Sequence, residues 1–229
     1  MSDVGALLTS LQFADSAFPS GFYTMSHGLE GYSQARLVPR SGVQPLLAGL
    51  LRHSVGPGDA TALAAAHRAA ADGDVELVQE VDQRLFASKL NAEMRRASVR
   101  SGHQLMDLGA ELIAQPLLAD YGDRVRRRVT PGCQPVATAV IYAASGVQTR
   151  QAVASDLFAF SASFVGAALR LRLTDHRQAQ AILLQTAGVI EEATDAALER
   201  DLADLGGCAP MADIMSAQHE TAEARLFAS

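Results

Sequence analysis

Alanine-rich segments recur along the chain, at residues 62–71, 137–144 and 159–168. Alanine has the strongest intrinsic preference for the α-helix. No segment alternates apolar and polar residues with the period of two that marks a half-buried strand, and no Asn-Gly pair joins two apolar runs as a hairpin would. We therefore predict an all-α fold, a single-domain helical bundle of about nine or ten helices.

The composition indicates one globular domain that spans residues 1–229. Hydrophobic residues make up 48% of the sequence and charged residues 19%, far from the polar, highly charged composition of disordered chains. A chain of this length can bury one large core. The net charge of −6 and the lack of a broad basic run argue against general binding of nucleic acids.

The sequence favours a cytoplasmic location. Asp3 and Asp15 bracket the first apolar stretch, so the basic-then-apolar order of a secretory signal peptide is missing. No uninterrupted apolar run approaches the ~20 residues of a membrane span. Cys133 and Cys208 lie far apart without a Cys-x-x-Cys partner, a pattern typical of free thiols rather than of a structural zinc site.

Apolar residues at helical spacing, separated by turn residues, divide the chain into its expected helices. We expect a helix to resume near Thr24 with Gly28 inside it, and a later helix to be stopped by Gly56-Pro57-Gly58. Asp59 then caps the next helix, and Asp72-Gly73-Asp74 ends it. Residues 119–135 are the best candidate for a mobile surface loop. The remaining helices are expected near residues 4–14, 75–86, 93–112, 136–144, 149–173 and 175–205.

The motifs of catalytic and nucleotide-binding proteins are missing from this sequence. It contains no Gly-x-Ser-x-Gly nucleophile elbow, no His-Glu-x-x-His pair and no phosphate-binding loop, and Lys89 is its only lysine. The arginine clusters at 95–96 and 126–128 are typical of solvated helix faces, with an acidic partner as the alternative. We expect no catalytic residue, no metal site and no cofactor in this chain itself.

Two segments near the ends of the sequence differ from this helical background. Pro19 fixes φ and Gly21 permits a positive φ, which together favour a turn. A glycine inside a helix, as we expect for Gly28, costs about 1 kcal/mol relative to alanine and marks the close approach of another backbone. The pair Leu226-Phe227 predicts a docked end, either on the chain's own core or in a groove of another protein.

Both segments resemble motifs of one known family, the urease accessory protein UreF. The residues from Phe18 to Glu30 read FPSGFYTMSHGLE, which is similar without a gap to the family's Leu-Pro-x-Gly-(Gly/Ala)-(Phe/Tyr)-Ser-x-Ser-x-Gly-(Leu/Ile)-Glu. Residues 216–220 and 225–229 read SAQHE and RLFAS, and they resemble the family's Ser-x-Arg-His-Glu and Arg-Leu-Phe-x-Ser. Residues 89–98, KLNAEMRRAS, resemble the family's Lys-Leu-Thr-Arg-Glu-x-Arg-x-Ala-Ser. The resemblance covers essentially the whole chain.

The resemblance implies an all-helical, homodimeric nickel-insertion chaperone without catalytic activity. Members of the family bind UreD (also called UreH), recruit or regulate the GTPase UreG and help to load apo-urease with nickel. It follows that UreD/UreH, UreG and apo-urease are the implied partners, and that nickel and GTP are handled by partner proteins. Residues 211–229 are the implied partner-docking segment.

The resemblance also implies which residues face these partners. Glu30 and Arg170 correspond to positions linked to the GTPase, and the C-terminal motif is tied to UreD. The implied partner-binding residues are Pro19, Gly21, Ser26, His27, Gly28, Glu30, Arg170, Ser216, His219, Glu220, Arg225, Leu226 and Phe227.

Three positions depart from the family's pattern. Phe22 stands where the turn has a second small residue, so a bulky ring must be placed there. Gln218 replaces the arginine before the His-Glu pair, which removes a charge and its donors. Residues 173–176, LTDH, stand where the family commonly has Pro-x-Gly-Gln after the basic residue of the long helix.

Two other functions stay open at this point. In a direct nickel carrier, His219 and Glu220 would ligate the metal across a dimer. In a helical hydrolase, His27 or His219 would act as the base.

Overall fold

The structure is a computed structural model that describes residues 2–228, and it is all-α, as the sequence predicts. The fold is 75% helical, with ten helices when the continuous helix α3–η3–α4 is counted once, and residues 2–228 contain no strand. The elements are α1 (Asp3–Ala14), α2 (Leu29–Gln34), α3 (Val43–Leu50), η3 (Leu51–Ala60), α4 (Thr61–Ala71), α5 (Val75–Ser88), α6 (Ala92–Leu112), α7 (Pro116–Arg126), α8 (Gln134–Ala144), α9 (Thr149–Arg170), α10 (His176–Glu199) and α11 (Pro210–Glu220), with short 3-10 turns at Phe22–Thr24, Arg40–Gly42 and Leu202–Asp204.

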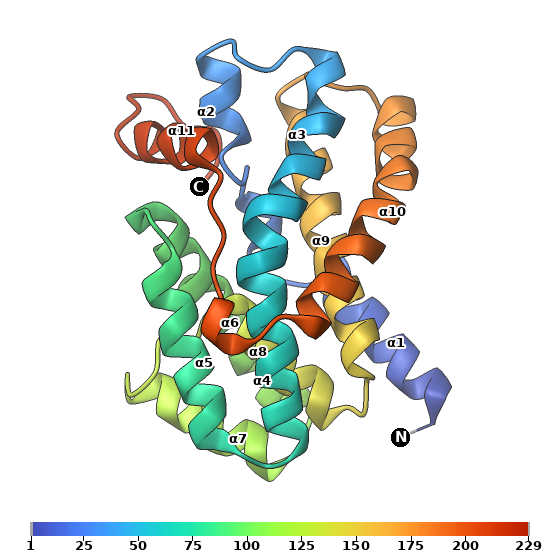
Figure 1. Cartoon of the computed structure of the whole chain (residues 1–229), viewed down its shortest axis with the longest axis vertical. Helices are drawn as coiled ribbons and strands as arrows, with labels where there is room; N and C mark the ends of the chain where they lie inside the picture. The colour runs from blue at the N-terminus through green and yellow to red at the C-terminus, as the bar shows by residue number, and fades with distance from the viewer. Residues whose placement is uncertain (1, 229) are drawn as a thin grey trace.

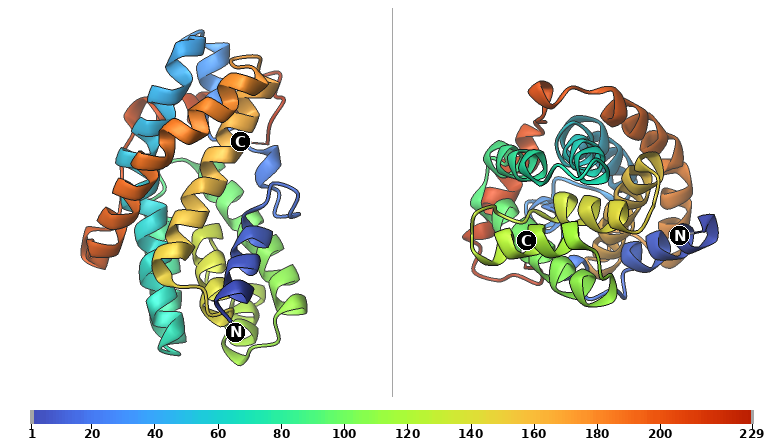
Figure 2. Two further views of the ribbon diagram at one scale, coloured as in Figure 1. Left: turned by 90° about the vertical axis from the view of Figure 1, so that its right-hand side faces the viewer. Right: turned by 90° about the horizontal axis from the view of Figure 1, so that it is seen from below.

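The core is built around α8 and the long continuous helix α3–η3–α4. Every residue of α8 from Gln134 to Tyr142 is buried, and the helix packs against α4, α6, α7 and α9. The continuous helix α3–η3–α4 contacts both α9 and α10, which pack against each other (Figures 1 and 2). α1 lies against α9 and α8, and α11 returns to pack on α2 and α6. The beginning and the end of the chain are thereby joined to the same bundle.

The helix that begins at Val43 does not stop at Gly56-Pro57-Gly58, so that prediction is wrong. It continues to Ala71 through the π-helical segment η3, with Pro57 inside it. Proline lacks an N–H group, and its ring displaces the carbonyl of the preceding turn. The loop before α11 compensates for this, because Cys208 N donates to His53 O at 2.8 Å and Gly206 N donates to Pro57 O at 3.1 Å. Residues 206–208 thus supply hydrogen-bond donors to helix carbonyls near Pro57, and the helix continues beyond the proline.

The sequence suggested that Asp59 is an N-cap, and this prediction is wrong. Asp59 lies inside η3, where its Oδ1 is 2.6 Å from Lys89 Nζ and both side chains are largely buried. Burial opposes the charge of Lys89, but the neighbouring acidic groups, Asp59 foremost, together outweigh it and raise the pKa of the ammonium group. This ion pair ties η3 to the residue that follows α5.

The prediction of a mobile loop over residues 119–135 is also wrong. Pro116 occupies the first turn of α7, where its missing N–H costs nothing. Leu118, Tyr121 and Val125 are buried on one face of this helix. A basic, glycine-containing sequence thus folds as an amphipathic helix against the core.

What remains of that loop, residues 127–133, is held by the buried carboxylate of Asp82. Asp82 Oδ2 accepts hydrogen bonds from Thr130 Oγ1 and from Gly132 N, each at 2.6 Å. Its Oδ1 accepts a third from Cys133 N at 2.8 Å. A single side chain of α5 therefore fixes the path of the loop.

Gly28 does not lie inside a helix, because α2 begins only at Leu29. Gly28 is the N-cap of α2 and has a φ of 84°, a conformation that glycine adopts without strain. The close approach that we expected at Gly28 occurs at Gly31, where a Cβ atom would lie 2.5 Å from Met215 O of α11. The two helices pack backbone to backbone within this chain.

α9 is long and apolar enough to cross a membrane by length and composition alone. Within its most apolar window, 56% of the residues are buried inside the protein. It also packs against α1, α4, α8 and α10. These contacts make α9 a core helix.

Candidate functional site

The two end motifs meet in one buried cluster. His219 of α11 lies between two carboxylates, and its Nε2 is 2.8 Å from Glu30 Oε2 of α2. On the other side of the ring, His219 Nδ1 is 3.1 Å from both carboxylate oxygens of Glu93 in α6. All three side chains are buried. We call these residues the Glu30–His219–Glu93 triad.

The starts of two helices position the carboxylates of the triad. Gly28 caps α2, and Asn91 caps α6 with its Oδ1, which accepts from Met94 N at 2.8 Å. Glu30 and Glu93 each stand in the first turn of their helix. The helix dipole favours negative charge at that end. The local sequence thus positions two carboxylates, and residues of the C-terminal motif contact both of them.

The tail after α11 docks on Glu30 with its backbone. Glu30 Oε1 accepts from Leu226 N at 2.8 Å, and Glu30 Oε2 accepts from Phe227 N at 3.0 Å. Ala228 N donates to Thr24 O at 2.9 Å, so the tail also pairs with the turn of the first motif. Phe227 is buried, whereas 66% of Leu226 is exposed. Of the two expected outcomes for this end, the structure shows docking on the chain's own core.

The charges of the cluster balance one another. Arg225 Nη1 lies 3.4 Å from Glu93 Oε1. An ionised carboxylate only accepts hydrogen bonds, so with both glutamates ionised the His219 ring must donate from both nitrogens and carry a positive charge. Two anions then face two cations. Buried charges are tolerated when they are paired and hydrogen-bonded in this way.

Arg170, at the end of α9, connects the first motif to the tail. Its guanidinium carbon lies 4.1 Å from the centre of the Tyr23 ring and 4.3 Å from that of the Phe227 ring. Its Nε donates to Gly166 O, whereas its Nη2 is buried without a hydrogen-bond partner among residues 2–228. Burial lowers the pKa of Arg170. The two rings, rather than an anion, hold this cation in place.

His27 contacts Ser163 of α9, with 2.9 Å between His27 Nε2 and Ser163 Oγ. The serine hydroxyl donates to Phe22 O at 3.0 Å, so His27 is the donor in its contact with the serine. Burial lowers the pKa of His27 to about 3, and the charge of Arg170 adds to this shift. A serine activated by a base would donate its proton to the imidazole. The observed polarity is the reverse of a nucleophile–base pair.

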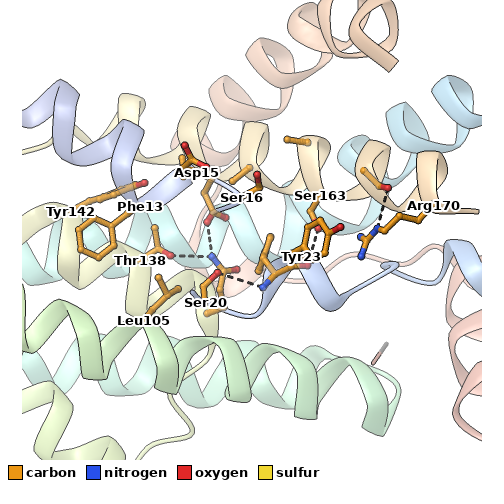
Figure 3. Close-up of a pocket in the computed structure, with 17 residues that line it drawn as sticks. Phe13, Asp15, Ser16, Ser20, Tyr23, Leu105, Thr138, Tyr142, Ser163 and Arg170 are labelled. Atoms are coloured by element: carbon orange, nitrogen blue, oxygen red, sulfur yellow. Dashed lines mark hydrogen bonds between the residues drawn. The ribbon is translucent and has the colours of Figure 1, made fainter. Parts of the chain in front are cut away.

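A cavity of about 130 Å³ lies beneath the first motif, between α9, α8 and the turn that holds Phe22 (Figure 3). Gln134 Nε2 bridges two polar groups on its wall, donating to Asp156 Oδ1 at 2.6 Å and to Thr138 Oγ1 at 3.0 Å. The ring of Phe22, where the family has a small residue, forms part of the wall. Arg170 lies at the end of the cavity opposite Tyr142 (Figure 3).

Comparison with known proteins shows to which family this architecture belongs. The sequence profile of the UreF family matches residues 40–187. The urease accessory protein UreF 2 of Brucella canis is 34% identical over 96% of this chain and 91% of its own length. The chain belongs to the UreF family. The urease accessory protein UreF of Trichodesmium erythraeum is 32% identical over 100% of this chain and 99% of its own length, and that of Yersinia enterocolitica is 29% identical over 97% and 98%. The resemblance seen in the end motifs is confirmed, and the protein is a UreF-family urease accessory protein.

The structure gathers most of the predicted site residues around the triad. Ser216 Oγ donates to Glu93 Oε2 at 3.4 Å, and Ser26 Oγ accepts from Glu30 N at 3.3 Å. Glu220 does not contact the triad residues and pairs instead with Arg96 at 2.6 Å. Pro19 and Gly21 belong to the adjoining turn, with Gly21 at a φ of 80°. The binding of a partner by these residues stays a prediction.

Glu93 is the member of the triad that the sequence does not single out. The segment 89–98 carried a signal, because it resembles a family motif that includes a glutamate. Its contact with His219 spans 126 residues of sequence, and no local pattern reveals such a pairing. Gln218, the departure in the C-terminal motif, is exposed and lies outside the cluster.

Proposed function

We propose that this protein is a cytoplasmic scaffold of urease maturation. It binds a UreD/UreH homologue through residues 211–229 and recruits or regulates the GTPase UreG, so that apo-urease receives its nickel. It works as a homodimer and contributes no catalytic residue and no cofactor of its own. Nickel is the cargo of the assembly, and GTP belongs to the GTPase.

The observation that supports this proposal is that the two end motifs close on each other and leave apolar side chains on the outside. Met211 and Ile214 of α11 are exposed, as is Leu226 of the tail. Tyr23 of the first motif is 58% exposed and stacks on Arg170 beside the tail. Large apolar side chains that stay exposed on the segments joined by the triad are candidates for contact with a protein partner. The buried triad fixes the backbone from which they project.

The geometry gives less support to the two other functions. A nickel ligand needs a free lone pair, but both nitrogens of His219 contact carboxylates, and Glu220 pairs with Arg96. No group of three or more His, Cys, Asp and Glu side chains suited to a metal ion occurs in the described part of the chain. A hydrolytic base must accept a proton from its nucleophile, whereas His27 donates to Ser163.

Leu226→Ala tests the docking role of the tail. Leu226 is exposed, so its truncation should leave the fold intact and weaken binding to a purified UreD homologue about tenfold, as for an apolar contact worth roughly 1.4 kcal/mol. Leu184→Ala on α10, where the leucine is also exposed, is the matched control. The dissociation constants can be measured by calorimetry or by interferometry.

Equal affinities of the wild type and Leu226→Ala would contradict the assigned surface. Deletion of residues 211–229 is a coarser test, because it also strips Glu30 of the two backbone donors from the tail. Loss of binding in the deletion but not in the point variant would therefore indicate a folding effect.

A further inference from the structure

Two cavities inside the bundle share one wall. The first, of about 130 Å³, lies under the turn that holds Phe22, and the second, of about 70 Å³, lies between that turn and η3. Phe22, Gln134 and Asp156 line both of them. Each is large enough to hold water or a few non-hydrogen atoms of a ligand. Asp156 is thus the carboxylate that both spaces have in common.

The Asp156 carboxylate forms no ion pair in the described part of the chain. It is buried, Oδ1 accepts from Gln134 Nε2, and no basic side chain pairs with it among residues 2–228. The nearby charge of Lys89 is already paired with Asp59. The guanidinium of Arg170, which also lines the first cavity, is held between two aromatic rings. A buried, ionised carboxylate without a counter-ion costs several kcal/mol. A cation that enters the cavity therefore forms a stabilising ion pair that the protein's own side chains do not provide.

The rest of the larger cavity suits the apolar part of an organic cation. The rings of Phe13, Phe22 and Tyr142 line it, and Ala159 and Ala162 leave the space between them open. Aromatic faces attract ammonium groups and pack well against short alkyl chains. Asp15, Ser16 and Tyr23 on the wall are exposed, which gives a path from solvent.

We propose that this cavity binds a primary alkylammonium ion, with the ammonium group at Asp156 and the alkyl chain among the aromatic rings. The ion replaces water and donates hydrogen bonds to the carboxylate oxygen that Gln134 leaves free. This property goes beyond the scaffold role and does not depend on it.

Protonation of Asp156 competes with the ion. Burial raises the pKa of Asp156 to about 7; Asp59 raises it further, whereas the hydrogen bond from Gln134 and the charge of Lys89 lower it. Besides Asp156, the charged and titratable groups around the two cavities are Asp15, Tyr23, His27, Asp59, Lys89, Tyr142 and Arg170. An ammonium ion binds the ionised carboxylate, so its affinity should rise about tenfold between pH 6 and pH 8.

The test uses the full-length protein and n-propylammonium chloride, titrated at constant chloride and followed by amide chemical shifts. Saturable shifts at Ala159 and Ala162 are expected, and Asp156→Asn should weaken binding at least tenfold. Asp107→Asn, an exposed carboxylate on α6, is the matched control and should change the affinity less than twofold. Nα-acetyl-lysine amide in a parallel titration distinguishes the sources, since its binding shows that a lysine of a partner can enter as well as a free amine.

Shifts that match a sodium chloride titration would overturn the proposal and leave a cavity that holds only water. Unchanged binding in Asp156→Asn would overturn it as well. Ala162→Phe gives a second criterion in case the asparagine variant misfolds, because it fills the cavity and leaves Asp156 in place. Retention of binding in that variant would also contradict the site.

Discussion

A buried imidazole between two buried carboxylates is stable only as a complete set. His219 contacts both carboxylates through its two ring nitrogens, and Arg225 pairs with Glu93 from the outside. Removal of one partner from a buried ion pair leaves an uncompensated charge, which costs more than the pair contributes. The triad therefore acts as an all-or-none contact between α2, α6 and the C-terminal segment.

His219→Ala should lower the free energy of unfolding by about 3 kcal/mol, because it leaves two carboxylates facing a void. Chemical denaturation with urea measures this loss. Combining it with Glu93→Gln should restore part of the stability, since only one buried anion remains. His176→Ala, at the exposed start of α10, is the control. A loss equal to that of the control would show that the triad is not closed in solution.

Asp156→Asn should stabilise the protein, and increasingly so with pH. The pKa of Asp156 is about 7, above its ordinary value of 3.8, so between these values the folded state binds more protons than the unfolded state. Stability therefore falls as pH rises through this window and levels off above it. The advantage of the asparagine variant should grow by about 2–3 kcal/mol from pH 5 to pH 8, measured by urea denaturation. If the difference in unfolding free energy between the variant and the wild type did not depend on pH, it would contradict a raised pKa of the buried Asp156 carboxyl group.

At the level of single residues, the sequence identifies two motifs that meet in the structure, but not the contacts between them. Glu30, His219 and Phe227 match family motifs, and in the structure Glu30 contacts both of the others. Contacts across more than a hundred residues leave no periodic trace in a sequence. The contact of Glu93 with His219 was not predicted for this reason. The pairing of Lys89 with Asp59 spans only 30 residues, but it joins η3 to the residue that follows α5 and likewise follows no local pattern.

At the level of elements, local signals placed helices well where the deciding contacts are local. Asp74 caps α5 through Leu77 N, and α4 ends at Ala71 as the Asp-Gly-Asp turn predicts. The prediction failed where distant groups decide. Pro57 stays helical because residues 206–208 satisfy its neighbours, and α7 replaces a predicted loop because its apolar face meets the core.

Gly31→Ala should separate α2 from α11. A Cβ atom at this position would lie 2.5 Å from Met215 O, so the two backbones must move apart at a cost of about 2 kcal/mol. Gly49→Ala in α3 meets nothing within 4 Å and should stabilise the protein by about 0.5–1 kcal/mol through helix propensity. Thermal unfolding and limited proteolysis of the C-terminal segment measure both effects. Equal stability of the two variants would show that α2 and α11 are not in contact.

At the level of the whole molecule, α1 presents an apolar face that nothing in the described chain covers. Val4, Leu7, Leu8 and Leu11 are exposed at helical spacing, while Ala6 and Phe13 pack inward. Asp3 is the only charged residue of this helix, so a second copy meets no row of like charges there. This face is the surface through which we expect the homodimer to form.

Leu8→Glu should weaken self-association at least tenfold, because it places a charge in the middle of an apolar contact. Light scattering coupled to size-exclusion chromatography measures the mass in solution. Leu184→Glu on α10 introduces the same charge on an exposed leucine of another helix and should leave the mass unchanged. A wild type that is monomeric at micromolar concentration would contradict the expected homodimer. A dimer that Leu8→Glu does not affect would show that its interface lies on another surface.

Because the chain is synthesised from its N-terminus, the triad can form only late in translation. Glu30 and His219 are 189 residues apart. Translation adds about 5–20 residues per second, so the partner of Glu30 is made roughly 10–40 s after Glu30 itself. During that interval α2 has no α11 to pack on, and its carboxylate remains in water. The triad can therefore close only after α11 has been synthesised. In a nascent chain that stops earlier, Glu30 has no His219 to contact.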